Sequence, residues 1–406
     1  MQVMKEIIVY LDDYKYSGDG KYDVLYLDFR TIDDYNLYIK ELELKQTAGT
    51  YIEIDGYSSP KRLVRGAYYA LNLDMLKVVP VEENENSLIL ARSYNFSNYS
   101  GQNDKSFHLL QSHEPLDPDE LNAPTHNKIE AFNELKTHVD LEFRVNDVSQ
   151  ANWNEVRQGN VVKIVYDIGA PITASKKVVR QYINQFAVQY ANDQPCLVLS
   201  HWDKDHYHCL LEMTDAEIKC FSRFVCIDKM KSAMSQLLFQ RLLNLLGPAN
   251  VFCHMPWSRT LGSDYPLVHK EFSNGALGFY TGESSRNTNY TGVLLFVKGV
   301  NGNVIFTGDC LPCQVNDVLQ DRFNVKDLNT EHYLVVPHHG GDFKSKAVYK
   351  TYQIPQGINA VEAIISVDEL NNSYGHPDAN MLNWLYSVAN WSIVRTDKVG
   401  TVVRKL

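Results

Sequence analysis

Short apolar runs separated by polar turns make up the first third of the chain. Residues 23–29 and 87–94 alternate between apolar and polar side chains, which is typical of strands with one buried face. Residues 60–76 predict a helix between these two runs. No grouping of reactive residue types occurs in this region. We therefore expect an accessory mixed α/β domain of unknown role over residues 1–135.

A polar stretch over residues 95–127 lies near the end of this region. It is rich in Asn, Ser, Asp and Pro, which is typical of a loop, and it is the best candidate for a linker. We place the domain boundary near residue 135 and a catalytic domain over residues 136–406. The chain has 406 residues, of which 44% are hydrophobic. That size suits two domains, or one large α/β domain with an appendage.

Strand patterns alternate with helical patterns beyond the boundary. Apolar residues recur at helical spacing over residues 176–191 and 230–247. The strand patterns cover residues 161–169, 196–201, 292–299, 303–309, 333–340 and 362–368. This alternation predicts a layered α/β domain. In such sheets the carboxyl ends of the strands carry the chemistry, and four of these strand patterns end in Asp, His or Ser.

Four potential metal ligands follow one of these strand patterns within six residues. They are His201, Asp203, Asp205 and His206, in the segment SHWDKDHYH. A loop that leaves a strand here can turn several of these side chains toward one point. Imidazole and carboxylate ligands together suit zinc, manganese or iron. The alternative is a polar surface turn, because His-x-Asp pairs also arise by chance.

Three further strand ends strengthen the metal interpretation. Asp309 follows a strand and a glycine, where the backbone can bring a carboxylate close to an ion. Two-metal hydrolases need a carboxylate that bridges the ions. His338 and His339 follow another strand, and His376 lies on a turn bounded by Gly and Pro. Each alone reads as a turn former, a surface loop or a cap, but together and in this order they favour a metal site.

The motifs HxDxDH, TGD, PHHGG and YGHP, in this order, resemble the metallo-β-lactamase fold. The resemblance is to the branch found in the competence protein ComEC and in related soluble hydrolases. Residues 146–156 and 164–169 are similar to that branch's opening hairpin, residues 287–297 to its N-x-x-S strand, and residues 394–403 to its closing hairpin. The resemblance leaves the first third of the chain unexplained. It implies an αββα sandwich and a site for two divalent metal ions, zinc or manganese.

The resemblance also implies a role for each motif residue. The implied metal ligands are His201, Asp203, Asp205, His206, Asp309 and His338. A water activated by the metal ions would attack phosphorus or a carbonyl carbon. Asp205, His376 and His339 are the candidate catalytic residues, with His376, or else His339, stabilising the developing charge or protonating the leaving oxygen.

Some positions depart from the family pattern. Asp203 stands where the commoner signature HxHxDH has a histidine, so it is either a weak ligand or a group that orients His201. The usual third-motif histidine has no clear counterpart, and His254 is the only nearby candidate. The opening motif DVGQGD reads DVSQAN here, and the typical HHGS reads HHGG.

Charge and cysteine content limit the binding partners and the cellular compartment to be expected for the protein. A net charge of −10 argues against a broad basic surface for nucleic acid or an anionic membrane, although a local basic groove is compatible with it. The seven cysteines do not read as a disulfide framework, and the start of the chain has no signal or membrane-spanning run. We expect a cytoplasmic protein with no membrane partner. Cys310 and Cys313 could form a thiol pair, clip a metal, or be two small buried residues.

Three functions follow from these observations. We expect a phosphodiesterase or nuclease whose partner is a nucleic acid or nucleotide substrate, partly by association with the competence branch. Lys344, Lys346 and Lys350 follow the histidine pair, where they either reach phosphates or begin a solvated helix. The second hypothesis is a carboxyl-directed metallohydrolase that cleaves a lactone, thioester or amide. The third is an interaction or scaffold module that binds a protein partner through residues 1–135.

Overall fold

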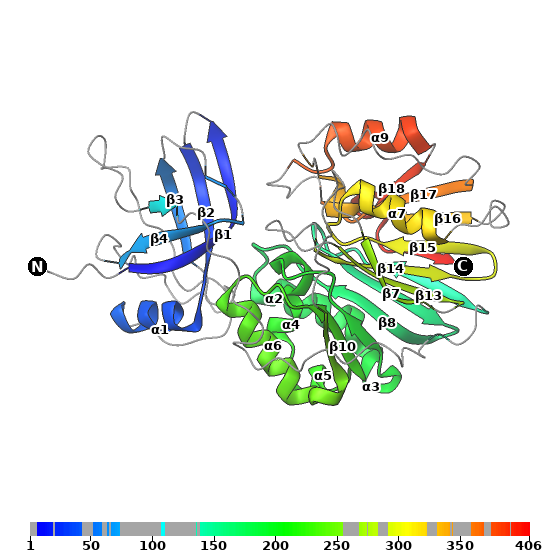
Figure 1. The fold of residues 1–406 in the computed structure, drawn as a ribbon, viewed down its shortest axis with the longest axis horizontal. Helices are drawn as coiled ribbons and strands as arrows, with labels where there is room; N and C mark the ends of the chain where they lie inside the picture. The colour runs from blue at the N-terminus through cyan, green and yellow to red at the C-terminus, as the bar shows by residue number, and fades with distance from the viewer. Residues whose placement is uncertain are drawn as a thin grey trace, which may run out of the picture. The chain divides into compact units, whose positions relative to one another are not determined.

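A computed structural model describes most of the chain (Figure 1). The described residues are 6–18, 21–42, 52–58, 63–64, 66–73, 107–109, 135, 139–254, 268–273, 275–282, 291–322, 331–341, 343, 359–368, 375–389 and 391–406. The chain divides into two compact units. Unit 1 comprises Met1–Leu121, Ala174–Val178 and Met230–Arg241, and unit 2 comprises Asn122–Thr173, Val179–Lys229 and Leu242–Leu406.

Unit 1 is built on an antiparallel sheet with the strand order β3-β2-β1-β4-β5. Its elements are β1 (Glu6–Gly18), β2 (Lys21–Phe29), α1 (Ile32–Glu41), β3 (Ile52–Ser58), β4 (Tyr68–Asn72) and β5 (Phe107–Leu109). Tyr35 and Tyr38 of α1 pack against Phe29 of β2. Ala233 also belongs to this core, although it lies far along the chain. The expected boundary near residue 135 stays a prediction.

The sequence expectations for this unit had mixed outcomes. The strand over residues 23–29 is confirmed as part of β2. The helix over residues 60–76 is wrong, because β4 occupies Tyr68–Asn72 and pairs with both β1 and β5. Aromatic residues favour a half-buried sheet surface, and these two pairings outweigh the helical spacing. Residues 87–94 lie outside the described residues, as does the expected linker except for β5.

The helix α1 was not expected from the sequence. Thr31 begins it with a capping box: its hydroxyl accepts a hydrogen bond from the Asp34 amide, and the Asp34 carboxylate accepts one from the Thr31 amide. This exchange satisfies two amides that the first turn of a helix leaves without partners. The signal, Thr-x-x-Asp, is present in the sequence.

The first sheet of unit 2 has the strand order β11-β10-β9-β8-β7-β6-β19. Its strands are β6 (Leu141–Val145), β7 (Trp153–Gln158), β8 (Val161–Ile168), β9 (Cys196–Val198), β10 (Arg223–Ile227), β11 (Val251–His254) and β19 (Val402–Lys405). Strands β8 to β11 run parallel to one another. The helices that connect them are α2 (Lys176–Phe186), α3 (Tyr190–Asp193), α4 (Lys204–Glu212), α5 (Asp215–Ile218) and α6 (Ala233–Leu246), of which α2 and α6 begin in unit 1.

The second sheet of unit 2 has the strand order β12-β13-β14-β15-β16-β17-β18. Its strands are β12 (Val268–Ser273), β13 (Leu277–Gly282), β14 (Val293–Lys298), β15 (Gly302–Phe306), β16 (Glu331–Val335), β17 (Asn359–Ile365) and β18 (Ser392–Arg395). Strands β15 to β18 are parallel. The helices α7 (Pro312–Arg322), α9 (Ala379–Ala389) and α10 (Thr396–Val399) accompany them, and one 3₁₀ turn covers Pro337–Gly340.

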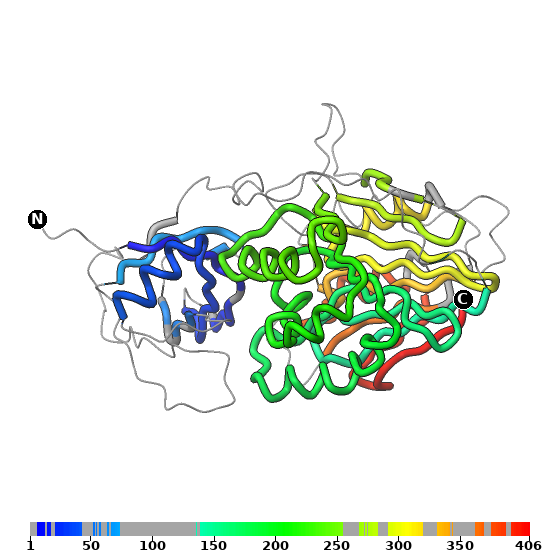
Figure 2. Tube along the Cα trace, turned by 90° about the horizontal axis from the view of Figure 1, so that it is seen from below, coloured from blue at the N-terminus to red at the C-terminus, as the bar shows by residue number. Residues whose placement is uncertain are grey.

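The two sheets of unit 2 pack face to face. The ring of Phe143 on β6 lies 6.1 Å from that of Phe306 on β15 and 5.3 Å from that of Tyr333 on β16, measured between centroids. Figures 1 and 2 show the helices on the outer sides, with α7 and α9 beside the second sheet and α3 to α5 beside the first. The expected α/β class and αββα layer order are therefore confirmed.

The strand patterns predicted for this unit all coincide with observed strands. The two predicted helices are shorter than expected, since α2 ends at Phe186 and α6 begins at Ala233. A 3₁₀ turn over Ala187–Gln189 and the short helix α3 cover the rest of the helix predicted over residues 176–191. No helix among the described residues is both long and apolar enough to span a membrane.

Candidate metal centre

The cluster His201 to His206 straddles the start of a helix. After β9, His201 precedes the N-cap residue Asp203, and the amide of His206 donates a 2.9 Å hydrogen bond to the Asp203 carbonyl. Asp205 and His206 therefore lie in the first turn of α4, and not in the loop that the sequence led us to expect. A helical turn holds these two side chains more firmly than a loop would, because its backbone is fixed by hydrogen bonds.

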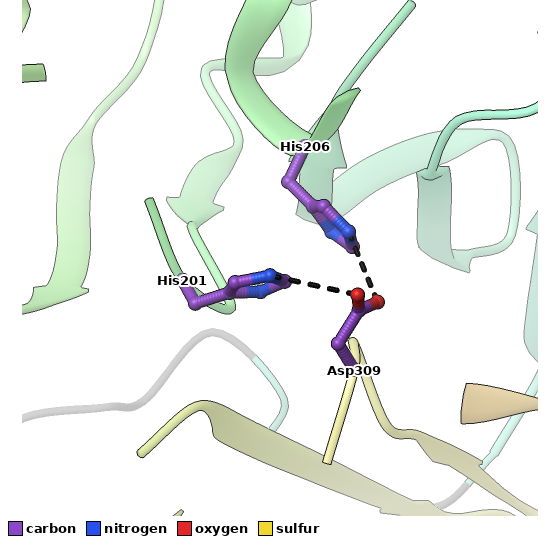
Figure 3. A group of neighbouring side chains, drawn as sticks. All are labelled: His201, His206 and Asp309. Carbon is purple, nitrogen blue, oxygen red and sulfur yellow. Dashed lines mark ion pairs between the residues drawn. The ribbon is translucent and has the colours of Figure 1, made fainter. Parts of the chain in front are cut away.

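Three histidines converge on the carboxylate of Asp309 (Figure 3 shows two of them). Its Oδ1 lies 3.1 Å from Nε2 of His206, and its Oδ2 lies 3.8 Å from Nε2 of His201. Nδ1 of His338 lies 2.5 Å from the same Oδ2. Asp309 is buried at the turn after β15, and the histidines come from the loop after β9, from α4 and from the turn after β16. Parallel strands thus bring motifs far apart in the sequence to one point.

A second group forms around Asp205. Its Oδ2 lies 3.2 Å from Nε2 of His339, and its Oδ1 lies 3.8 Å from Nε2 of His206. The sequence assigned His339 to leaving-group chemistry, but the structure places it among the candidate ligands. In the described part of the chain, the groups close enough to share an ion are His201, His206 and Asp309, and Asp205, His206 and His339.

The remaining candidates lie at different distances from these groups. Oδ2 of Asp203 is 3.3 Å from Nε2 of His201, which suits either role proposed for Asp203. The ring of His376 lies 5.2 Å from that of His338. Nδ1 of His254 lies 3.7 Å from a carboxylate oxygen of Glu271 on β12, and His254 belongs to neither of the two groups found among the described residues.

Asp167 supports the cluster and was not assigned a role from the sequence. It lies near the end of β8, is fully buried and has a φ of 60°, a left-handed conformation that Asp tolerates better than most residues. Its carboxylate accepts hydrogen bonds from Nδ1 of His206 at 2.8 Å and from the amide of Ser200 at 2.7 Å. The Asp-x-Gly of the opening motif was the available signal.

Two glycines let the backbone segments of the centre approach closely. A Cβ on Gly169 would collide with the backbone carbonyl of Asp205, and a Cβ on Gly308 would lie 2.7 Å from the side chain of Ser200. Gly308 also has a φ of 51°, which glycine adopts without strain. These contacts fix α4 against β8 and the Asp309 turn against β9.

In this centre, burial and the attraction between opposite charges shift the pKa values of the side chains in opposite directions. Burial raises the pKa of Asp309, but the imidazoles of His338, His206 and His201 outweigh it and hold that pKa well below its ordinary value. Burial lowers the pKa of His206, but the carboxylates of Asp309, Asp167 and Asp205 raise it well above the usual range. The buried carboxylates are therefore ionised and draw positive charge toward themselves.

The donor atoms of the centre fit a metal ion. Nε2 atoms of His201, His206 and His339 are buried and make no hydrogen bond within the part of the chain that the structure describes. Buried polar atoms are nearly always satisfied, so three such nitrogens beside two carboxylates call for a ligand. Nδ1 of His206 is held by Asp167, and Nδ1 of His339 by the Ser366 carbonyl at 3.0 Å, which directs Nε2 inward.

The cysteines near the centre do not resemble a metal clip. Burial raises the pKa of the Cys310 thiol well above its usual range, and it raises that of Cys313 to about 11. Both are buried, and neither belongs to the two groups of candidate ligands found among the described residues. This favours the interpretation of two small buried residues. Lys344, Lys346 and Lys350 lie outside the described residues.

Comparison with known proteins gives weak likenesses. No protein-family model matches the chain, and no curated protein is similar to it in sequence. Among solved structures, Tm1679, a metal-dependent hydrolase of the β-lactamase superfamily, shares 11% identity over 66% of this chain and 99% of its own, with a TM-score of 0.38.

Two further structures are similar at the same level. The diiron β-hydroxylase CmlA from Streptomyces venezuelae shares 13% identity over 66% of this chain and 54% of its own, with a TM-score of 0.36. Zinc-bound PqqB from Methylobacterium extorquens shares 9% identity over 65% of this chain and 100% of its own, with a TM-score of 0.32. At these scores the likenesses alone assign neither a family nor an activity.

Proposed function

We propose that the protein is a metal-dependent hydrolase that uses water activated by two divalent ions, zinc or manganese. The observation that carries this proposal is the convergence of three buried imidazole Nε2 atoms, which make no hydrogen bond among the described residues, on two ionised carboxylates. Such a donor set suits transition metals, zinc and manganese among them. A surface turn or a structural cluster would satisfy these nitrogens with hydrogen bonds.

The geometry favours a particular set of ligands. Asp309 presents one oxygen to His206 and the other to His201 and His338, as a carboxylate that bridges two ions would. Asp205 and His339 form the neighbouring pair. We therefore add His339 to the ligands inferred from the sequence, and we keep Asp203 as either a ligand or a residue that orients His201.

The bound ions would supply a hydroxide near neutral pH and stabilise negative charge on the attacked group. The chain's own residues prepare this chemistry. Asp167 fixes the orientation of His206, and both side chains are fully buried. His339 is buried, its Nδ1 is held by the Ser366 carbonyl, and its Nε2 faces Asp205 among the candidate ligands. His376, which is only partly buried, is the better candidate to protonate a leaving oxygen.

We propose a phosphodiester as the substrate, in a nucleic acid or a nucleotide. Carboxylate-rich metal sites suit hard phosphoryl oxygens. The order of motifs, which resembles that of the competence branch, points the same way, although fold alone does not decide a substrate. A role for unit 1 in binding a protein partner is compatible with this activity, and we keep it as a part of the proposal.

A metal-by-substrate screen tests the proposal. The full chain is stripped with a chelator, reloaded with zinc or manganese, and assayed on single- and double-stranded DNA, RNA, cyclic nucleotides and bis-nitrophenyl phosphate, with chromogenic lactones and thioesters in parallel. Asp309→Asn is the inactive variant, and Asp317→Asn on α7 is its matched control. Metal-dependent cleavage of phosphodiesters, lost only in Asp309→Asn, supports the proposal. Cleavage of lactones or thioesters alone would show that the enzyme is carboxyl-directed. Failure to bind either metal would overturn the proposal of a metal-dependent hydrolase.

A further inference from the structure

Gly341 lies between the two histidines at the edge of the metal centre. A Cβ built on this glycine would collide with Cδ2 of His338 and with Cε1 of His376, and it would lie 2.7 Å from Nε2 of His376. Real Cβ atoms do not approach other atoms so closely. The two rings belong to separate turns of the chain, and the absence of a side chain at residue 341 is what lets them lie 5.2 Å apart.

The backbone does not require glycine at this position. Gly341 has a φ of −69° and a ψ of 157°, a conformation that any residue adopts. Its neighbour Gly340 differs, because a φ of 79° favours glycine for conformational reasons. Glycine is therefore required at residue 341 because a side chain there would overlap the two rings. The Ser that the typical motif HHGS would place here does not fit that space.

His338 is not free to move away from a side chain at residue 341. Its Nδ1 is held by Asp309, and its carbonyl accepts a 2.7 Å hydrogen bond from the amide of Gly341. The ring of Phe343 lies 5.6 Å from the His338 ring. Any added atom would therefore push on the ring of His376.

The turn that carries His376 is tied to the same segment. The amide of Asp378 donates a 2.8 Å hydrogen bond to the carbonyl of Gly340, and Pro377 packs where a Cβ of Gly340 would be. The backbone of the His376 turn is thus fixed. A side chain added at residue 341 would therefore displace the imidazole of His376 and not the turn that carries it. The Cε1–Nε2 edge of that ring is the part that would be displaced.

We propose that Gly341 is a positioning residue for His376: its missing side chain makes the space in which the Cε1–Nε2 edge of His376 lies beside His338. This inference rests on the proposed function in one respect, which is that His376 protonates the leaving oxygen. A side chain at residue 341 then displaces the proton donor while leaving the metal ligands in place.

Gly341→Ala tests the inference, with Gly302→Ala as a matched control. Gly302 begins β15 away from the metal centre, and a Cβ there would meet a ring carbon of Tyr333 at 3.1 Å. We expect Gly341→Ala to keep its metal and to lower kcat about 10- to 100-fold on a substrate with a poor leaving group, as a small displacement of a catalytic group does. The loss should be much smaller on a nitrophenolate ester, and KM should change little. Gly302→Ala should retain normal kcat on both substrates.

A double variant separates positioning from general damage. If Gly341 acts through His376, Gly341→Ala added to His376→Ala should cost nothing further in kcat, because the ring to be displaced is gone. Additive losses would overturn the inference, and so would a normal kcat for Gly341→Ala on the poor leaving group. Should Gly341→Ala fold poorly, recovery of its melting temperature in the double variant supports the clash with His376, and no recovery refutes it.

A spectroscopic measurement is independent of any activity. In protein labelled with ¹⁵N-histidine, the imidazole signals of His376, assigned by their absence in His376→Ala, should shift in Gly341→Ala and stay unchanged in Gly302→Ala. If the His376 signals shift but the protein hydrolyses none of the substrates, the positioning role of Gly341 is supported and the proposed function is refuted. Unshifted signals in an active enzyme would remove the inference alone.

Discussion

Nδ1 of His206 donates a 2.8 Å hydrogen bond to a carboxylate oxygen of Asp167, and both side chains are fully buried. The bond fixes the orientation of the imidazole, so that Nε2 faces Asp309. Asp167 holds this position with a left-handed backbone, which costs an L-residue about 1 kcal/mol. A residue kept in a strained conformation beside a cluster of ligands is typical of a functional site.

We expect Asp167→Ala to weaken metal binding without emptying the site. The ligands remain, but His206 loses the partner that orients it, and such losses reduce metal affinity by about 10- to 100-fold. Competition with a chromophoric chelator measures the change. Asp317→Asn serves as the control, since it alters a carboxylate outside the centre. Wild-type affinity in Asp167→Ala would show that the hydrogen bond contributes only to folding.

Asp309→Ala should lose most of its metal. Among the described residues, Asp309 is the one carboxylate in contact with His201, His206 and His338 together. We expect about two ions per chain in the parent protein, with Asp309 between them. Elemental analysis of both proteins after reconstitution with zinc and with manganese provides the measurement. A variant that still carries both ions would place the bridging group elsewhere.

His254→Ala should keep both metal content and activity. The side chain contacts Glu271 and is not in either group of candidate ligands in the described residues, although the sequence made it the only candidate for the third-motif histidine. The same elemental analysis and a phosphodiester assay decide the point. Loss of one ion in this variant would restore His254 as a ligand.

Asp317→Asn should stabilise the protein more at high pH than at low pH. Burial raises the pKa of Asp317 from 3.8 to about 6, so the folded chain holds its proton more tightly than the unfolded chain. The protonated carboxyl supports folding fully below pH 3.8, and that contribution is lost as the pH rises through about 6. Because the side chain is partly exposed, we expect a gain of about 1 kcal/mol at pH 8 and a smaller one at pH 5. Urea unfolding at both pH values measures it, and an equal gain at the two would contradict this origin.

The sequence was most informative where buried strands end in polar residues. His201, Asp309 and His338 each follow such a strand. Parallel pairing of β15 and β16 brings Asp309 and His338 to one edge of the second sheet, while His201 follows β9 of the first sheet. The helical turn at Asp205 was not recognised, because the cluster HxDxDH has no apolar periodicity of its own. The position of His339 was not predictable, since two adjacent residues with φ values near 50° direct their side chains in ways that the sequence pattern does not show.

Errors in the first third of the chain have a different cause. The run around Tyr68 has apolar residues at helical spacing, but its conformation is decided by pairing with β1 and β5. Those partners are distant in the sequence, and a local window contains no sign of them. By contrast, the capping box at Thr31 is local and could have been found.

His376→Ala separates a proton donor from a metal ligand. The ring of His376 lies beside that of His338, and neither histidine belongs to the two groups of candidate ligands in the described part of the chain. His338 contacts the carboxylate of Asp309 at 2.5 Å, which is the reason to keep it as a ligand, whereas His376 lies beside His338 on a separate turn. We therefore expect the variant to keep its metal and to lower turnover about 10²- to 10⁴-fold, the usual range for a lost general acid. That loss should shrink on a nitrophenolate ester, whose leaving group needs no proton. If His376 were only a cap on its turn, the variant would melt at a lower temperature and keep near-normal activity per folded molecule. Loss of metal would instead make His376 a ligand, so metal content, melting temperature and the two rates together decide its role.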